Sequence, residues 1–376
     1  MGLVGRVCAV DSVDQAAEVL EASELPAGVD VERHTVILAW TADKWCVCNE
    51  DGRASSASRY GQTVNADAGT GRITVDREQS RPWVEVAQSA RVLRDLLTET
   101  PAAVAGSPFR IIDEDIPESC ETWCRSYLSS ALEHLGLWAD HVAPLTFHPD
   151  AVVHHDARPA QTLARAALES ASQAVWVMAS RDPREVLRRH LSLVLADWEE
   201  QRKAEPEPQR KAGLKQQRLD LLKILEAHGV KTSEPSYLTL VTAAAREVRS
   251  KAPTADLGDP ARVERLWRAS AGSAHGKMWP SVELRVSVEL NGQRYAFPDA
   301  DAMSAILVLA DKVTQYGVFR FIDYAGHEPQ LAERLQMTTR RWYARIPKVA
   351  GAPERLEDAT GHPVPASGSA DPSQSR

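Results

Sequence analysis

Apolar residues recur with helical spacing along most of the chain from Glu118 onward, and this periodicity constrains the fold more than any other feature. In the range 118–143, one helical face carries Trp123, Tyr127, Leu128, Ala131, Leu135 and Trp138. Asp182, Pro183 and Glu185 together form a helix-start signal, with an N-cap, a proline at the first helical position and a carboxylate three residues after the cap. Further segments of helical character follow at 159–178, 214–228, 237–250, 260–275, 302–316 and 328–344. The sequence therefore predicts a mainly α-helical protein, built as a helical bundle.

One segment departs from the helical spacing. Residues 281–290 alternate strictly between apolar and polar side chains, which is the period of a β-strand. Asn291 and Gly292 then supply the residues that a type I′ turn requires, and Tyr295–Phe297 can return as the second strand. We expect a β-hairpin at 281–297, inserted into the helical bundle.

The segments before and after the bundle differ from it in pattern. The first hundred residues combine strand-like stretches, a loop rich in Ser and Gly, and a helical segment at Trp83–Thr98, so a small separate α+β unit is predicted at 1–105. The bundle is expected at 118–349. Residues 350–376 are rich in Gly, Pro, Ala and Ser and have too few apolar side chains to order themselves, so a disordered tail is predicted there.

Charge and hydropathy exclude some classes of protein. The formal net charge of −8 argues against a protein that coats nucleic acid by bulk electrostatics, so any site for a polyanion must be a local patch. No apolar stretch approaches the roughly 18 to 20 residues needed to cross a bilayer. The first residues also lack the pattern of a secretory signal. We expect a cytoplasmic protein with no membrane association.

The cysteines do not form a recognised pattern. Their odd number, five, without a secretory signal does not fit a disulfide framework. Cys120 and Cys124 are close enough to share a zinc ion, but no second pair follows at a zinc-site spacing. A P-loop, a dinucleotide-binding glycine pattern and a nucleophile elbow are absent from the sequence. We expect no metal and no cofactor.

The strongest candidate for chemistry is the segment from Trp267 to Gly276. Seven residues turn a helix through about 700°, so Arg268 and His275 would share one face, roughly 10 Å apart. A guanidinium can hold phosphate oxygens, and an imidazole can move a proton to or from a ribose hydroxyl. The alternative is structural: Gly276 has the character of a helix-ending glycine, and His275 would then be a favourable residue for the last turn.

Three further sets of residues could support such a site, and each has a structural alternative. Arg184 and His190 would lie about 120° apart on one helix, with His190 bordering the apolar stripe and Arg184 near the solvated face. Arg165 and Glu169 have the (i, i+4) spacing of an ion pair, which usually ties a helix together. A basic segment with aromatic residues could contact phosphates and stack on bases, or could form a solvated helix end. Its residues are Arg340, Arg341, Trp342 and Arg345.

Three segments together resemble a known family. They are LARAALESASQAVWVM, then REVLRRHLSLVLADWEE, then PSYLTLVTAAAREV with RLWRASAGSAHGKMW. Over about residues 159–275 the chain resembles a group of uncharacterised actinobacterial proteins whose helical core is similar to the HEPN superfamily. The resemblance implies a short helical bundle, homodimerisation and, in many members, a metal-independent ribonuclease with an Arg-x(4–6)-His motif. Arg268 and His275 match this motif with six intervening residues, and Arg184 and His190 match it with five.

These observations lead to two main hypotheses. The first is a metal-independent endoribonuclease that acts on single-stranded RNA, in which Arg268 neutralises the phosphate and His275 is the acid or base. Arg184, His190 and Glu169 would support this site, and the segment 340–345 would guide the strand. The second is a non-catalytic helical interaction or regulatory module, defence-linked, in which His275 caps or packs. A DNA-binding helix-turn-helix at 221–247 is the weakest reading, because its second helix has few basic residues.

Overall fold

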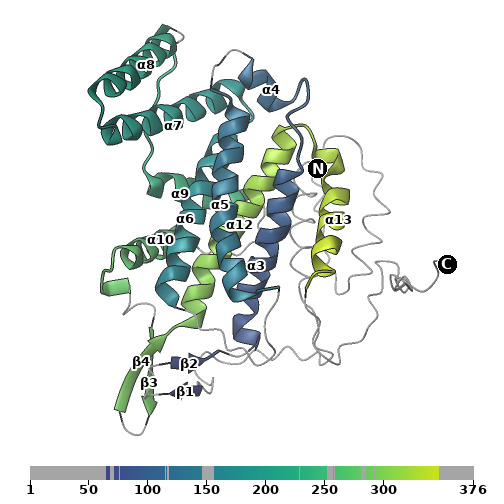
Figure 1. The fold of residues 1–376 in the computed structure, drawn as a ribbon, viewed down its shortest axis with the longest axis vertical. Coiled ribbons are helices and arrows are strands. Elements are labelled where there is room, and N and C mark those ends of the chain that lie inside the picture. The colour runs from purple at the N-terminus through teal and green to yellow at the C-terminus, as the bar shows by residue number, and fades with distance from the viewer. Residues whose placement is uncertain are drawn as a thin grey trace, which may run out of the picture. The chain divides into compact units, whose positions relative to one another are not determined.

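The computed structural model describes residues 65–67, 72–75, 77–114, 116, 118–145, 156–227, 229–251, 257, 259–280, 285–290 and 293–346. Most of these residues are helical (Figure 1), which confirms the prediction of a mainly α-helical protein for the described part of the chain. The helices are α3 (Arg77–Thr98), α4 (Pro108–Asp113), α5 (Cys120–Val142), α6 (Ala157–Met178), α7 (Pro183–Ala204), α8 (Pro208–Ala227), α9 (Tyr237–Lys251), α10 (Pro260–Ala274), α12 (Ala300–Tyr324) and α13 (Leu331–Tyr343), with a short 3-10 turn at Glu328–Gln330.

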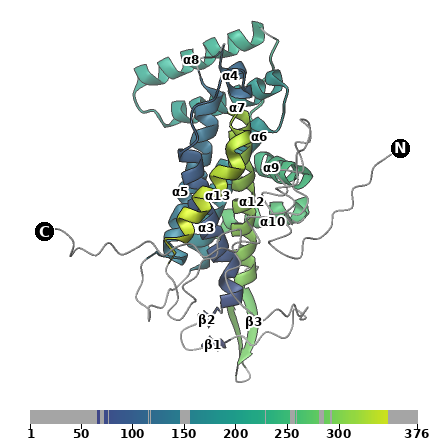
Figure 2. The ribbon, with the colours of Figure 1, turned by 90° about the vertical axis from the view of Figure 1, so that its right-hand side faces the viewer.

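The core lies between four long helices, α3, α5, α6 and α12, which run side by side in Figures 1 and 2. Helix α12 is buried on nearly every side, because it also contacts α9 and α10. Gly317 of α12 lies close to two neighbouring helices. A Cβ atom there would be 2.7 Å from Leu128 Cδ2 of α5 and 3.2 Å from Val175 Cγ2 of α6. The absence of a side chain at this position lets the three helices pack closely. None of the described helices is long and apolar enough to cross a membrane.

Helix α3 belongs to this core, which corrects one predicted boundary. The sequence placed Trp83–Thr98 in a separate unit at 1–105. In the structure α3 packs against α5, α12 and α13, and the Trp83 ring lies edge-on to Trp138 of α5 at 6.2 Å. The apolar stripe of α3 predicted a helix correctly, but the stripe does not say which partner covers it. Residues 1–64 and the predicted tail at 350–376 lie outside the described residues.

Two short antiparallel strand pairs are also described. Strands β1 (Asn65–Asp67) and β2 (Arg72–Thr74) pair with Asn65 opposite Thr74. Strands β3 (Arg285–Leu290) and β4 (Gln293–Pro298) pair from Arg285 opposite Pro298 to Leu290 opposite Gln293. The last pair lies within the range of the expected hairpin, whose residues 281–284 and turn residues Asn291 and Gly292 are outside the described part.

Helix α12 has a buried carboxyl group, whose charge should affect the stability of the folded protein. Asp311 is buried against α3, and within the described structure its Oδ1 atom has no hydrogen-bond partner. Burial raises the pKa of this carboxyl group, against smaller opposing effects of Lys312 and of the Ser89 hydroxyl. The folded pKa therefore exceeds the unfolded one. The folded state keeps its full stability below the unfolded pKa of about 3.9 and loses part of it as the pH rises through the folded value.

We therefore expect Asp311→Asn to stabilise the protein at pH 7.5 by about 1 to 2 kcal/mol, because the amide has a similar shape without the buried negative charge, and one unit of pKa shift corresponds to about 1.4 kcal/mol. The measurement is urea unfolding of both proteins at pH 4 and pH 7.5. The gain should shrink at pH 4, where the aspartic acid is protonated. An equal gain at both pH values would show that the charge of Asp311 is not the cause.

Candidate functional site

The C-terminal end of α10 places His275 in solvent. The helix starts at its N-cap Asp259, whose side chain accepts a hydrogen bond from the Arg262 backbone, and it ends at Ala274. His275 is the C-cap, and Gly276 follows with φ +68°. The N–H of Gly276 donates to the Ser273 carbonyl at 3.1 Å, and the N–H of Lys277 donates to the Gly272 carbonyl at 2.8 Å. These two bonds form a Schellman motif, so the backbone alone closes the helix.

The imidazole of His275 takes no part in this closure. The side chain is exposed, and within the described structure it has no hydrogen-bond or ion-pair partner. The predicted helix-ending role of Gly276 is therefore present, but it needs only the glycine and not the histidine ring. A polar ring held at a fixed backbone position and open to solvent is available for chemistry.

Arg158 of α6 contacts the two residues that follow His275, and no local pattern in the sequence predicts this contact. Its Nη2 atom donates to the Lys277 carbonyl at 3.3 Å, and its Nη1 atom lies 4.0 Å from where a Cβ atom of Gly276 would be. The guanidinium group thus contacts the two residues that follow His275. Because Arg158 and Lys277 are 119 positions apart, only the packing of α6 against α10 brings them together.

Arg268 lies on α10 two turns before His275, as the spacing predicted. It is exposed, its Nε atom pairs with Glu264 Oε1 at 2.7 Å, and its Cζ atom lies 5.9 Å from the Trp267 ring centroid. The ion pair joins it to the preceding turn, whereas His275 lies toward the end of the helix. Arg158 contacts the backbone that follows His275, whereas Arg268 lies roughly 10 Å from His275 along the helix.

An exposed aromatic ring follows directly after this helix end. The chain folds back over Gly272, where a Cβ atom would be 2.6 Å from Pro280 Cγ and 3.2 Å from Trp279 Nε1. Trp279 nevertheless remains 45% exposed and Met278 remains 74% exposed. We name the set His275, Arg158, Arg268, Lys277 and Trp279 the α10-end cluster. It combines an imidazole, three cationic side chains and an aromatic face that can stack on a base.

Glu169 holds α6 and α10 together. Its Oε1 atom pairs with Arg165 Nε at 2.7 Å and also accepts a hydrogen bond from Trp267 Nε1 at 2.7 Å. The Arg165 guanidinium lies 5.7 Å from the Trp267 ring centroid. Glu169 therefore positions the residue that precedes Arg268. Neither Arg268 nor His275 is among its partners in the described structure, so its expected supporting role is indirect at most.

Arg184 and His190 do not form a second site. Arg184 is exposed in the first turn of α7, whereas His190 is completely buried. The Nε2–H of His190 donates to the Glu118 carbonyl at 2.6 Å, and its ring lies edge-on to Trp123 at 6.1 Å. Burial lowers the pKa of His190. The supporting role expected of His190 is corrected, because the ring cannot reach a substrate from the core; it links α7 to the start of α5.

The basic segment near the end of α13 is also largely structural. Trp342 is only 2% exposed and its Nε1–H donates to Asp95 Oδ2 of α3 at 2.8 Å. Arg341 pairs with Asp95 at 3.1 Å and with Glu99 at 2.7 Å, and the Cζ atom of Arg345 lies 4.0 Å from the Trp342 ring centroid. The expectation that Trp342 stacks on nucleotide bases is corrected, because its ring is covered. Of the four residues, only Arg340 is exposed with no partner in the described structure.

No family model, curated protein or solved structure matches the chain. The resemblance to HEPN proteins therefore stays a prediction. Metal ligands do not gather in the described residues, since no group of three or more His, Cys, Asp or Glu side chains is placed to hold an ion there. Cys120 and Cys124 are both buried within α5, and hydrogen bonding to Cys124, together with burial, raises the pKa of the Cys120 thiol.

Proposed function

We propose that the chain is a metal-independent ribonuclease that acts on single-stranded RNA, with His275 as its proton-transfer group. The observation that supports this proposal is the exposed imidazole of His275, which has no partner in the described structure, at a helix end whose next two residues contact the Arg158 guanidinium. The resemblance to the HEPN superfamily implies the same activity and fold, with Arg268 and His275 as the motif residues. We add Arg158 to these residues, because its guanidinium contacts the backbone that directly follows His275.

The reaction needs only one proton transfer at this imidazole. Neutral His275 accepts the proton of a ribose 2′-hydroxyl, and the oxygen attacks the adjacent phosphorus. The bond from phosphorus to the 5′-oxygen breaks, the leaving oxygen takes a proton from solvent, and the products carry a 2′,3′-cyclic phosphate and a 5′-hydroxyl. Arg158 and Arg268 would stabilise the charge on the phosphate oxygens. Trp279 would stack on a neighbouring base.

The test is cleavage of end-labelled single-stranded RNA in the presence of EDTA. We expect the parent protein to cleave, and His275→Ala to cleave about 100-fold more slowly, as is typical when a general acid or base is removed. His134→Ala on α5 is the matched control and should keep the parent rate, because His134 is outside the α10-end cluster. Circular dichroism would establish that each variant is folded. An unchanged rate in His275→Ala would overturn the assignment of His275.

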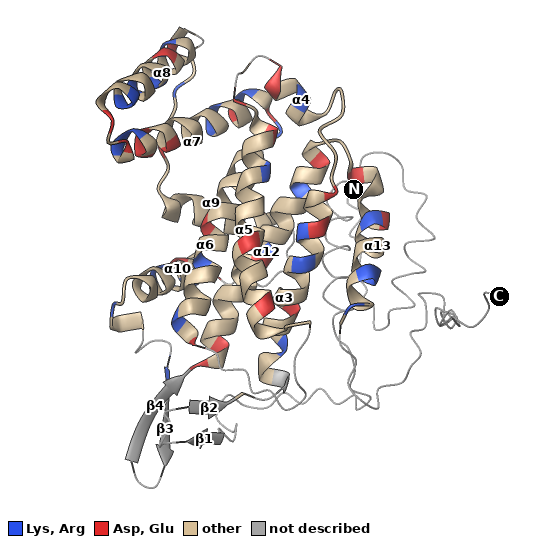
Figure 3. Ribbon diagram, viewed as in Figure 1, with Lys and Arg blue, Asp and Glu red and all other residues tan. Residues whose placement is uncertain are grey.

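A second candidate function, a helical interaction module, is supported by the hairpin of α7 and α8. Helix α8 contacts chiefly α7, through a small cluster formed by Leu191, Val194, Leu195, Leu221 and Leu225. The hairpin projects away from the long helices (Figures 1 and 2), and charges of both signs alternate along it (Figure 3). Leu219 and Ile224 of α8 remain exposed. Such a helix can present apolar side chains to a partner.

The two candidates can be distinguished with one pair of proteins. Leu219→Asp with Ile224→Asp should leave RNA cleavage unchanged if the chain is a ribonuclease acting through the α10-end cluster. If the parent protein does not cleave RNA but self-associates, and the double variant does not, the interaction module is favoured. Light scattering after size exclusion gives the oligomeric state and tests the expected homodimer at the same time.

A further inference from the structure

A pocket opens at the other end of α10, away from its C-terminus. Its volume is about 250 Å³, and it lies between the start of α12, the first turns of α10 and the start of α3. Most of its lining is aliphatic: Leu257, Leu266, Ala305, Val308 and Leu309. The lining places the pocket at residues 262 and 266 of α10, so it does not include His275.

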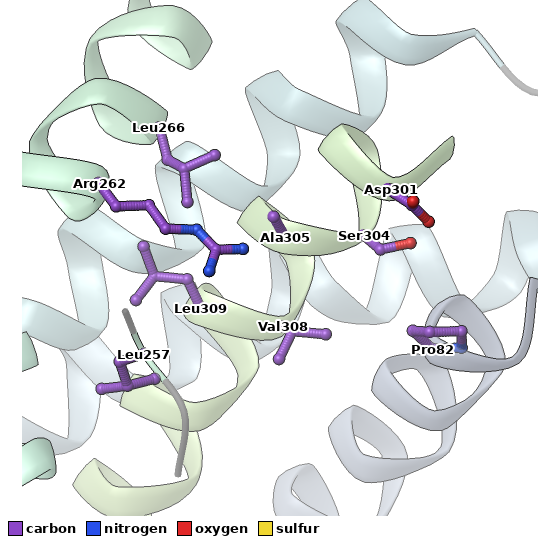
Figure 4. A pocket seen from close by; sticks show the side chains of 9 residues that line it. All are labelled: Pro82, Leu257, Arg262, Leu266, Asp301, Ser304, Ala305, Val308 and Leu309. Carbon is purple, nitrogen blue, oxygen red and sulfur yellow. The ribbon is translucent and has the colours of Figure 1, made fainter. Parts of the chain in front are cut away.

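One cation enters this apolar surface. Figure 4 shows the side chain of Arg262 extending from α10 toward α12, with its guanidinium between Leu266 and Leu309. The Arg262 backbone N–H is used by the N-cap Asp259, but within the described structure the guanidinium has no hydrogen-bond or ion-pair partner. Arg262 is exposed, so its guanidinium can be reached by a ligand from solvent. A guanidinium beside an aliphatic surface, with no acceptor from the protein, can bind an acceptor from a ligand.

The other polar groups of the pocket limit what that ligand can be. Ser304 already donates its proton to the Ala300 carbonyl at 2.8 Å and accepts a hydrogen bond from Trp83 Nε1 at 2.8 Å. Ser304 therefore cannot donate to a ligand. Asp301 lies across the pocket from Arg262 in Figure 4 and has a negative charge. The negative charge of Asp301 opposes a ligand with two or more negative charges more strongly than it opposes a single carboxylate paired with Arg262.

We infer that this pocket binds a small organic acid with one carboxylate and an apolar body. The carboxylate would pair with the two outer nitrogens of Arg262, and the body would lie against Leu266, Ala305 and Leu309. The pocket is smaller than the range of about 300 to 1,000 Å³ typical of drug-sized ligands, so a compact molecule fits best. The inference is independent of the proposed ribonuclease, because none of the α10-end residues lines the pocket.

The test is a ligand-observed NMR titration of the full chain with 4-phenylbutyrate. A molecule of this size that pairs one carboxylate and buries an apolar ring should bind with a dissociation constant on the order of 1 mM. Two comparison probes separate the contributions: 4-phenylbutanol has the apolar body without the charge, and butyrate has the charge without the ring. We expect both to bind at least tenfold more weakly.

Substitutions of pocket residues test whether 4-phenylbutyrate binds in this pocket. Arg262→Gln should weaken 4-phenylbutyrate binding about tenfold, and Ala305→Phe should abolish it by filling the space. Arg265→Gln, on the same helix but outside the lining, is the matched control and should bind as the parent does. Equal binding of acid and alcohol, unchanged binding by Arg262→Gln, or no binding of 4-phenylbutyrate at 10 mM would each overturn the inference. RNA cleavage by Arg262→Gln should equal that of the parent, so a failure here is separable from a failure of the ribonuclease proposal.

Discussion

Replacing Trp342 by alanine should destabilise the protein by about 3 to 5 kcal/mol, the usual cost of truncating a buried aromatic side chain. The ring is 2% exposed, so its removal leaves a cavity between α13 and α3. The change also removes the hydrogen bond to Asp95 and the contact with the Arg345 guanidinium. For a chain of 376 residues the melting temperature should fall by roughly 4 to 6 °C. Thermal unfolding followed by circular dichroism measures the change.

A matched control lies on the same helix. Met337 is 55% exposed, so Met337→Ala should change the melting temperature by little. An RNA-binding assay of Trp342→Ala distinguishes a structural role of Trp342 from the base-stacking role that the sequence suggested. A ring that stacks on bases would, when removed, weaken RNA binding and leave stability unchanged. That result would mean that α13 leaves α3 when RNA binds, and the buried placement of Trp342 would not represent the active protein.

Local signals in the sequence predicted most of the helices, but α4 (Pro108–Asp113) was not predicted. Asp182 accepts a hydrogen bond from the Arg184 backbone at 3.1 Å, and Pro183 opens α7, as the start signal predicted. Gly276 adopts the left-handed conformation expected of a residue that ends a helix. Such signals involve only a few neighbouring residues, so they can be recognised without knowing which helices pack together.

The placement of chemically active residues was not predictable in the same way. Arg165 and Glu169 form the ion pair that their spacing indicated, but the bond from Trp267 to Glu169 joins residues 98 positions apart. Arg158 likewise reaches the end of α10 only because α6 and α10 pack together. An amphipathic pattern shows which face of a helix is covered, but it does not name the helix that covers it. The pairing of helices therefore decided which basic residue reaches the end of α10.

The same limit explains the basic segment of α13. Arg341 and Trp342 lie in a stretch without acidic residues, which suggested a surface for phosphate. The acidic partners, Asp95 and Glu99, come from α3 and are invisible in the local pattern. A positive segment in a sequence is available to nucleic acid only if the fold leaves its charge unpaired. The α10-end cluster is the better candidate because the imidazole of His275 is exposed and has no partner in the described structure.

His190 gives the second large expected effect. His190→Ala should destabilise the folded protein by about 3 kcal/mol, because it opens a cavity beside Trp123 and leaves the Glu118 carbonyl without its donor. Urea unfolding at pH 7.5 measures this loss. His134→Ala, a change to a less buried histidine of α5, should cost well under 1 kcal/mol. A small effect of His190→Ala would contradict the bridging role assigned to the ring.

The pH dependence of stability tests the same residue in its charged form. Burial lowers the pKa of His190 in the folded state, so the unfolded state binds the proton more readily. Stability is then full above the unfolded pKa of about 6.5 and is lost as the pH falls below it, by at most about 1.4 kcal/mol per pH unit for one proton. The parent protein should therefore lose stability between pH 7 and pH 5.5, and His190→Gln should lose less over the same range, while His134→Gln follows the parent. If His190 were a catalytic group open to solvent, its protonation would change the rate of RNA cleavage and leave the free energy of unfolding unaltered.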